Sequence, residues 1–388
     1  MLTTQKEIST PTRVLSGSVK VHVVDPSAYT PPYDHALCAA LASAGLDVEL
    51  YTSHFAYAPA PEPAGYRRRE TFYRLARATP AAPPGSAGSW ARRAIKLAEH
   101  IPDMLRYRVA ARAADVVHFQ WLALAQLDGP LLPRGRPLVL TAHDILTRYA
   151  TPGQRAAERR LYRRFDAVIT HSARGRERLI DELGLAPERV HAIPHGAFAH
   201  LAATAPAPLP EGLADTGEPV VLCFGLIRPY KGIDVLLEAW RRIEGAQLWI
   251  VGLPRYDVSA LRASAGASVS WVPRFVSDGE LAACFRRADL LVAPYLESEQ
   301  SGVVATALAF GSPMLLSDVG GLGEVAQAGA AQLVAPGDPG ALREAIAGLL
   351  GDREARVALS AGARGLAEGE WSWRRVAERT AALYRSLL

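Results

Sequence analysis

Two stretches in the second half of the chain combine glycines with groups that can bind phosphate. Residues 220–232 read VVLCFGLIRPYKG, which predicts a buried strand, a turn at Gly225, and then Arg228 and Lys231 at the start of a helix. Arginine offers a planar fork to phosphate oxygens and lysine a compact point charge, so the pair suits a diphosphate. The chain has only four lysines, so composition alone does not explain a lysine at 231. The alternative is two solvated cations, which the dipole at a helix N-terminus disfavours.

The second stretch, residues 288–324, predicts strand, loop, helix and strand in succession. An apolar run at 290–293 leads into a polar loop, and Gly302 opens a helix that ends at Gly311. In parallel sheets such a loop faces the ligand crevice, and the free N–H groups of the helix favour an anion. Gly302 keeps side-chain atoms away from that ligand. The amides offered would be those of Ser301, Gly302, Val303 and Val304.

Together these stretches resemble the retaining glycosyltransferases of family 4, which have the GT-B fold. The first family motif matches at Gly225, Arg228, Lys231 and Gly232. The end of the second matches at Ala309, Gly311, Pro313, Gly320, Gly321 and Glu324. The two glutamates of the family pattern fall on Ser298 and Thr306. The sequence Gln300-Ser301-Gly302-Val303 resembles a branch that lacks this pair.

The resemblance implies roles for individual residues. Thr306 would contact the donor ribose and Glu299, or Glu297, the donor sugar, while Arg274 and Phe275 would lie near the base. Glu324 is either a nucleotide contact or a stabilising first-turn carboxylate. The resemblance implies a nucleotide-diphosphate-sugar donor, a hydroxyl-bearing acceptor and no covalent nucleophile. Arg228, Lys231 and the helix amides would stabilise the leaving diphosphate. We expect no cofactor and no metal, since the chain has no Asp-x-Asp motif.

In the first half, two predicted strands end in polar corners, His118-Phe119-Gln120-Trp121 and His143-Asp144. The carboxyl ends of such strands border the crevice of a doubly wound domain. By resemblance, His143 would contact the donor sugar near the reacting carbon; the alternative is a structural corner. The first loop carries Tyr29-Thr30-Pro31-Pro32 instead of the glycines usual in the family, which argues against backbone-amide contacts to phosphate there. We place Tyr29, His118, Gln120 and Trp121 on the acceptor side.

The elements that position these residues form two series of alternating strands and helices, separated by a Pro-rich stretch. This pattern predicts an α/β protein with two Rossmann-like doubly wound domains facing a central cleft. We assign residues 1–18 to a disordered tail, 19–200 to an acceptor-binding domain and 201–217 to a linker. Residues 218–370 would bind the nucleotide-sugar, and 371–388 would form a helix that crosses back to the first domain.

The 388 residues carry a net charge of +4 and only three scattered cysteines. The cysteines predict neither a disulfide framework nor a metal site and fit a reducing cytoplasm. Nothing resembles a nucleic-acid-binding motif. The N-terminal stretch lacks the apolar region of a secretory signal.

A basic region spans residues 66–112. We expect an irregular excursion over 59–89 and a helix over 92–112 that is broken near Pro102. Its arginines, interleaved with apolar residues, could contact an anionic membrane at the inner face of the plasma membrane. The alternative is a solvated helix face.

Three other functions stay open. Another GT-B enzyme, an epimerase or a phosphorylase, would need a different motif order. A dinucleotide-dependent oxidoreductase would need Gly-x-Gly-x-x-Gly after the first strand, where this chain is Pro-rich. A non-catalytic protein that binds nucleotide-sugars would fit the two missing glutamates.

Overall fold

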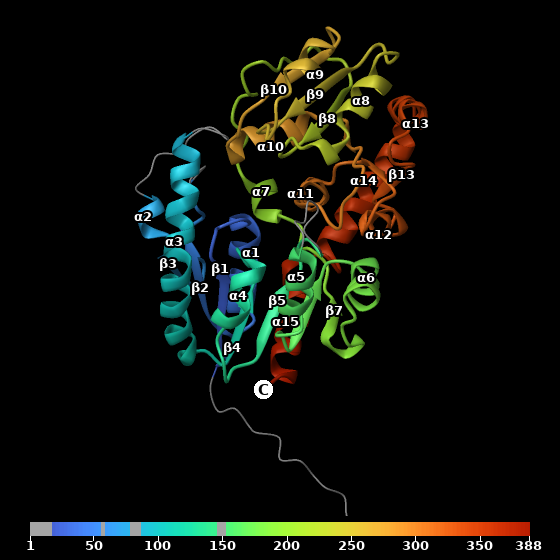
Figure 1. Cartoon of the computed structure of the whole chain (residues 1–388). Coiled ribbons are helices and arrows are strands. Elements are labelled where there is room, and N and C mark those ends of the chain that lie inside the picture. Colours follow the sequence, from blue (N-terminus) through green and yellow to red (C-terminus); the bar gives the residue numbers. More distant parts are fainter. Residues whose placement is uncertain (1–17, 56–58, 78–86, 146–152) are drawn as a thin grey trace, which may run out of the picture.

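Two parallel β-sheets form the centres of two α/β domains, which lie one above the other in Figure 1. The computed structural model describes residues 18–55, 59–77, 87–145 and 153–388. The predicted tail therefore lies almost wholly outside the described residues. The fold predicted from the strand–helix alternation is confirmed.

Within the described residues, the sheet of the first domain has the strand order β3-β2-β1-β4-β5-β6-β7. Its strands are β1 (Lys20–Asp25), β2 (Asp47–Ser53), β3 (Arg67–Phe72), β4 (Val116–Phe119), β5 (Leu138–Thr141), β6 (Ala167–Thr170) and β7 (Val190–Ala192). The sheet of the second domain has the order β10-β9-β8-β11-β12-β13. Its strands are β8 (Val220–Phe224), β9 (Gln247–Val251), β10 (Val269–Val272), β11 (Leu290–Ala293), β12 (Met314–Ser317) and β13 (Ala331–Val334).

Both sheets reverse their strand order beside their first strand, between β1 and β4 and between β8 and β11. In open α/β sheets, ligands bind at such switch points, at the carboxyl ends of the strands. The central strands β4, β5, β6, β11 and β12 are buried along their whole length. This explains their continuous apolar runs, because a sheet covered on both faces has no solvent side.

The helices of the first domain are α1 (Pro31–Ser43), α2 (Arg74–Arg77), α3 (Ala87–Ala110), α4 (Ala125–Leu131), α5 (Gln154–Tyr162), α6 (Ala173–Leu183) and, at its end, α7 (Ala199–Ala203). Those that follow are α8 (Ile233–Trp240), α9 (Ser259–Ala263), α10 (Asp278–Arg287), α11 (Gly302–Phe310), α12 (Leu322–Gln327), α13 (Pro339–Gly351), α14 (Arg353–Glu368) and α15 (Trp373–Ser386). Short 3-10 turns are η1 (Ala111–Ala113), η2 (Pro187–Arg189) and η3 (Pro229–Lys231). Side-chain caps begin two of these helices: Ser172 caps α6, and Ser277 forms a capping box with Glu280 on α10.

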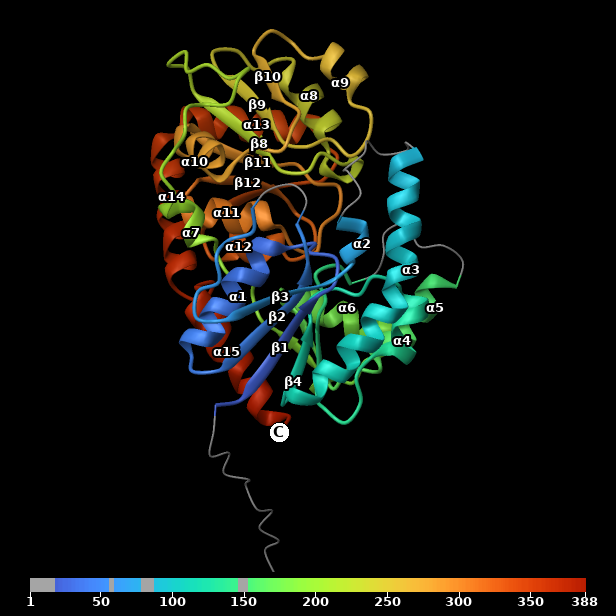
Figure 2. The same ribbon diagram turned by 90° about the vertical axis from the view of Figure 1, so that its left-hand side faces the viewer.

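The last helix, α15, returns to the first domain, as predicted. It packs against α1, and Figure 2 shows the two helices side by side. Val376, Ala381 and Tyr384 of α15 are buried in the same core as Val21 and Leu37. The hydroxyl of Tyr384 lies 2.6 Å from Nδ1 of His118, so the crossover helix reaches the carboxyl end of β4.

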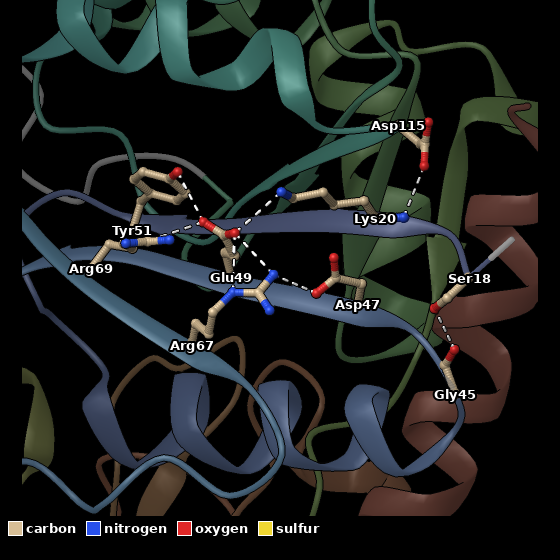
Figure 3. Close-up of polar contacts among 9 residues, drawn as sticks. All are labelled: Ser18, Lys20, Gly45, Asp47, Glu49, Tyr51, Arg67, Arg69 and Asp115. Atoms are coloured by element: carbon tan, nitrogen blue, oxygen red, sulfur yellow. Dashed lines mark hydrogen bonds and ion pairs between the residues drawn. The ribbon is translucent and has the colours of Figure 1, made fainter.

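The excursion expected over residues 59–89 is wrong in part, because β3 and α2 lie within it. β3 pairs with β2 at the edge of the sheet, where Arg67 and Arg69 contact the buried carboxylate of Glu49 (Figure 3). Burial by itself would raise the pKa of Glu49. Hydrogen bonds from Arg69, Lys20, Arg67 and Tyr51 outweigh burial and lower that pKa to about 2. Charge pairing with the neighbouring strand therefore orders a segment that has no apolar alternation.

The break expected near Pro102 is also wrong, because α3 runs through it as one helix. Proline removes the hydrogen bond to the carbonyl of the residue four positions earlier, here Ala98. Both residues are exposed, so solvent can reach that carbonyl. Within the described residues, no helix combines the length and the apolar character that a membrane span requires.

Candidate active site

On the second domain, three segments meet at the N-terminus of α11. Ser301 caps this helix by accepting a hydrogen bond from the N–H of Val304, and its Oγ lies 3.2 Å from the hydroxyl of Tyr295. The ammonium of Lys231 lies 3.6 Å from the centre of the Tyr295 ring. The ring therefore positions the lysine by a cation–π contact beside the helix N-terminus. A lysine and the amides of a helix start are together a site for an anion. Of the predicted amides, that of Val304 is bonded to Ser301, so a contact from it to a ligand would compete with the cap.

Glycines let these segments approach one another. Gly225 has a φ of +109°, and a Cβ built on it would lie 2.7 Å from Cγ2 of Val303. Gly232 has a φ of +64°, and its Cβ would lie 2.0 Å from the carbonyl oxygen of Pro294. Any larger residue would push the β8 loop away from α11 or from the loop after β11. The glycines of the first motif are thus explained by packing around the candidate anion site.

On the first domain, four buried histidines gather at the carboxyl ends of β4 to β7. We call His118, His143, His171 and His195 the histidine cluster. Nδ1 of His143 lies 3.2 Å from Nε2 of His171, and Nε2 of His143 lies 3.2 Å from the side-chain amide of Gln120. The ring of Trp121 stacks on His143 at a centroid distance of 4.9 Å. Tyr33 packs edge-on against His143 and His195.

Burial lowers the pKa of these histidines, to about 3 for His118 and His195 and about 4 for His171. Burial also lowers the pKa of His143 well below its usual value. The rings are therefore neutral near pH 7. Nδ1 of His171 faces the carbonyl of Ile193, which can only accept, so this nitrogen carries the proton. Nε2 of His171 and Oε1 of Gln120 are then both acceptors that face His143, and the single N–H of the neutral His143 ring can be donated to one of them at a time.

The loop after β1 is organised by the carboxylate of Asp25. It accepts hydrogen bonds from the N–H groups of Ser27, Tyr29 and Thr30 at 3.2, 2.6 and 3.2 Å. These amides are therefore already bonded within the protein. The exposed Arg228 of the second domain interacts electrostatically with Tyr29 of this loop. Burial raises the pKa of the Tyr29 phenol, and the charge of Arg228 opposes that shift.

The two domains also touch at the N-terminus of α6. Oε1 of Glu324 accepts hydrogen bonds from the N–H groups of Ala173 and Arg174, at 2.7 and 3.4 Å. Arg178, one turn further along α6, forms an ion pair with Glu299. A carboxylate at a helix N-terminus is favoured by the helix dipole. α6 thus holds two carboxylates of the second domain, and we call these contacts the α6 latch.

Two family profiles and several known proteins match this chain. Residues 33–197 match the profile of Glycosyltransferase Family 4, and residues 218–352 match that of Glycosyl transferases group 1. D-inositol 3-phosphate glycosyltransferase 1 of Catenulispora acidiphila is 31% identical over 350 residues, which is 81% of each chain. The chain belongs to the family 4 glycosyltransferases.

A further relative of this glycosyltransferase is the 2-deoxystreptamine glucosyltransferase of Streptomyces kanamyceticus. It is 28% identical over 261 residues, 61% of this chain and 67% of the relative. Among solved structures, Anabaena HepE in complex with UDP-glucose is similar, with a TM-score of 0.72 and 17% identity over 95% of this chain and 100% of that one. Sucrose-phosphate synthase from Thermosynechococcus elongatus has a TM-score of 0.71 and 21% identity over 95% and 99%. At these identities, the structures establish the GT-B fold alone.

The structure brings most of the predicted donor residues of the glycosyltransferase together. Lys231, Ser301 and the start of α11 converge, Gly225 packs against Val303, and Arg228 lies at the cleft. Gly302, the first residue of α11, has no side chain to cover these amides. Their roles in donor binding stay predictions.

Five other predicted donor residues are engaged within the protein. The hydroxyl of Thr306 donates to the carbonyl of Gly302 at 2.8 Å, and Arg274 forms an ion pair with Glu280. Phe275 packs near Phe55 of the first domain, with ring centres 6.5 Å apart. The fourth, Glu299, pairs with Arg178, and Glu324 likewise belongs to the α6 latch. A donor contact by Glu299 or Glu324 would therefore compete with α6.

Sequence reasoning placed His118, Gln120, Trp121 and His143 in one region, and the structure joins them. It missed Tyr295, Arg178, His195 and the partners of His118, which are Tyr384 and Thr141. A signal did exist for His171, because it follows β6 as His143 follows β5. Within the described residues, no three His, Cys, Asp or Glu side chains are arranged to hold a metal ion. The expectation that catalysis needs no metal stays a prediction.

Proposed function

We propose that this enzyme transfers a sugar from a nucleotide-diphosphate-sugar to a hydroxyl group with retention of anomeric configuration. The single observation that carries the proposal is the convergence of Lys231, Ser301 and the start of α11, closed by Gly225. The HepE neighbour, whose title names UDP-glucose, supports a nucleotide-sugar donor. The local sequence Gln300-Ser301-Gly302-Val303 supports the branch without the usual glutamate pair.

The chemistry requires stabilisation of a leaving diphosphate. The bond between the anomeric carbon and the phosphate oxygen breaks, and its electron pair goes to that oxygen. The acceptor oxygen bonds to the same face of the carbon, and its proton passes to the departing phosphate. Lys231, Arg228 and the α11 amides stabilise the developing negative charge without moving. Closure of the two domains excludes water, so the sugar passes to the acceptor and is not hydrolysed.

The acceptor, we infer, contains a cyclitol ring. The names of two relatives state cyclitol acceptors of opposite charge, D-inositol 3-phosphate and 2-deoxystreptamine. The candidate acceptor wall of neutral histidines, Trp121 and Tyr29 offers stacking surfaces and hydrogen-bonding groups. Such surfaces bind polyhydroxylated rings by apolar and polar contacts together.

A donor panel tests the proposal. UDP, GDP, ADP and their glucose or mannose derivatives are each added to the purified enzyme, and the melting temperature is recorded. One nucleotide should raise it, because a ligand at 100 times its Kd stabilises the fold by about 2.7 kcal/mol. Its sugar should then be transferred to a cyclitol, with the anomeric configuration read by NMR. Binding without transfer or hydrolysis would instead support the non-catalytic alternative.

A membrane contact through α3 is a second proposal, supported by an apolar stripe. Leu97, Ile101, Leu105 and Val109 recur every fourth residue, and all four are exposed, between 43% and 59%. Arg93 and Arg106 are exposed on the same helix. A helix with an exposed apolar stripe beside cations suits an anionic bilayer surface. The relative from Mycobacterium leprae, a phosphatidyl-myo-inositol mannosyltransferase, has a lipid acceptor in its name.

Flotation with phosphatidylglycerol vesicles at low salt tests this second proposal. The enzyme should float with the vesicles, and Leu97→Asp together with Leu105→Asp should abolish flotation. Val357→Asp, at an exposed valine on α14, is the matched control and should still float. Absence of flotation by the unaltered enzyme contradicts the membrane contact.

A further inference from the structure

A small hollow lies beside the cleft in the first domain, at the carboxyl end of β2. Its lining includes Asp34 and His35 of α1, Ser53 of β2, Phe55, Tyr66 and Arg68. The hollow encloses about 20 Å³, which suits one hydroxyl or ammonium group and no larger one. Neither the motifs nor the predicted acceptor residues include these side chains.

Two polar atoms in this lining lack a hydrogen-bond partner among the described residues. They are Oδ1 of Asp34 and Oγ of Ser53, in side chains that are 1% and 5% exposed. Buried polar groups in folded proteins nearly always have a partner, so two orphans on one hollow point to a ligand group. A ligand hydroxyl can donate to the carboxyl oxygen and accept from the serine. An ammonium can donate to both.

The charges of the hollow exclude a phosphate. Asp34 is hydrogen-bonded to the buried Asp25, and burial raises the pKa of both groups, so the pair shares a proton and keeps one negative charge. Arg68 is the cation in the described lining, and its Nε lies 3.7 Å from Oε1 of Glu70. Burial lowers the pKa of His35 and leaves it neutral near pH 7. No lining cation is therefore left without a carboxylate to receive an anionic group.

The lining of the hollow lies near residues that face the second domain. Ala28, between the amides that Asp25 binds, is part of the lining, and the next residue is Tyr29, which feels the charge of Arg228. Phe55, also in the lining, packs near Phe275 of the second domain. These contacts place the hollow beside the face that the first domain turns toward the second.

We propose that this hollow anchors one hydroxyl or ammonium group of a neutral or cationic polyol acceptor, and that a phosphorylated ring is not the preferred acceptor. The inference rests on the proposed function, which it deepens by choosing between the two kinds of cyclitol. Asp34 and Ser53 are the residues that would set this specificity.

Equilibrium binding of ring compounds to the whole enzyme tests this acceptor preference independently of donor chemistry. The probes are myo-inositol, 2-deoxystreptamine and inositol 3-phosphate, measured by saturation-transfer NMR and titration. We expect the neutral and cationic rings to bind at least about tenfold more tightly than the phosphate, since an unpaired anion cannot enter beside a buried carboxylate. Preferred binding of inositol 3-phosphate, or no binding of either other ring, overturns the inference.

Two variants locate the binding. Ser53→Ala should weaken binding of myo-inositol about three- to tenfold. Asp34→Asn should weaken 2-deoxystreptamine by a similar factor, because an ammonium can draw the negative charge of the pair onto Asp34 but not onto an asparagine. Ser43→Ala, at an exposed serine of α1 that donates to the carbonyl of Ala39, is the matched control. Unchanged polyol binding in both variants would mean that the hollow holds only water.

The same variants separate this inference from the proposed function. The rise in melting temperature caused by the nucleotide should be equal in Ser53→Ala, Asp34→Asn and the unaltered enzyme. If no nucleotide stabilises the enzyme while polyol binding still depends on Ser53, the donor assignment is wrong but the assignment of the hollow as a polyol site is supported. If nucleotides bind and the polyols do not, the hollow fails alone.

Discussion

The two walls of the cleft are built from different chemistry. All ten histidines of the chain lie between His22 and His200, and four of them form the buried, neutral cluster of the first domain. The second domain has no histidine but holds Lys231, the exposed Arg228 and the amides of α11. The histidine cluster is thus neutral and held largely by hydrogen bonds within the first domain, whereas the second domain carries positive charge on Lys231 and Arg228. The contrast supports the proposal that the second domain binds the anionic donor and the first domain the polyol acceptor.

The largest effect is expected from Lys231→Ala, which removes positive charge from the donor wall. Loss of one preorganised electrostatic contact costs about 10²- to 10³-fold in kcat. The rise in melting temperature with the preferred nucleotide should also disappear. Arg241→Ala, on the exposed cation that follows α8 and pairs with Glu238, should change neither quantity. An unaltered nucleotide response in Lys231→Ala would remove the phosphate assignment.

The next effect concerns the histidine wall in acid. Because burial lowers the pKa of His118, His171 and His195 to between about 3 and 4, the unfolded chain takes up protons that the folded chain cannot. Their stabilising contribution is complete above pH 6.5 and falls below it by about 4 kcal/mol per pH unit for the three. Burial raises the pKa of Asp25 and Asp34, which opposes this loss, whereas the lowered pKa values of His22 and His143 add to it.

Thermal unfolding between pH 7 and 5, with hydrogen exchange followed separately in each domain, measures this acid effect. The first domain should lose protection at a higher pH than the second, which has no histidine. Equal acid sensitivity of both domains would show that the histidine cluster does not set the stability of its wall.

A smaller effect is expected from Trp121→Ala, which uncovers His143 on the acceptor wall. The substitution removes the ring stacked on His143 and the hydrogen bond from its indole N–H to Thr30. We expect kcat/KM for the acceptor to fall about tenfold, which is the value of one stacking contact with its hydrogen bond. Nucleotide binding should be unchanged. A loss of nucleotide binding would mean that this wall also holds the donor.

The smallest effect tests the α6 latch, the place where the two walls touch. Glu324→Ala removes the carboxylate from the N-terminus of α6, which should cost about 1 kcal/mol of unfolding free energy. For a chain of this size, the melting temperature should fall by about 2 °C. Glu344→Ala, at an exposed glutamate of α13, should leave it unchanged. If Glu324→Ala also abolishes nucleotide binding, Glu324 is a nucleotide contact and not only a cap.

The donor wall could be predicted from the sequence because its parts are local. Gly225 to Lys231 and Ser301 to Val304 each lie within one strand–loop–helix unit, so motif and structure coincide. The acceptor wall depends on distant contacts. His118 is held by Tyr384, 266 residues away, and no local pattern announces that pair. β3 was missed for a related reason, since Glu49 on the neighbouring strand orders its arginines.

For the loop after β1, one property could be predicted from the sequence and another could not. Its prolines predicted a loop without glycine-mediated phosphate contacts, and the structure shows its amides bonded to Asp25. The sequence did not reveal that Asp25 also pairs with Asp34, because burial of two carboxyls is a property of the packed domain.

The central claim, that the second domain grips the diphosphate, is tested most directly by a crystal structure of the enzyme with UDP or whichever nucleotide stabilises it. The claim predicts that the β-phosphate contacts the ammonium of Lys231 and the amides at the start of α11, with Arg228 at its side. A diphosphate bound elsewhere, away from Lys231 and Gly302, would contradict it.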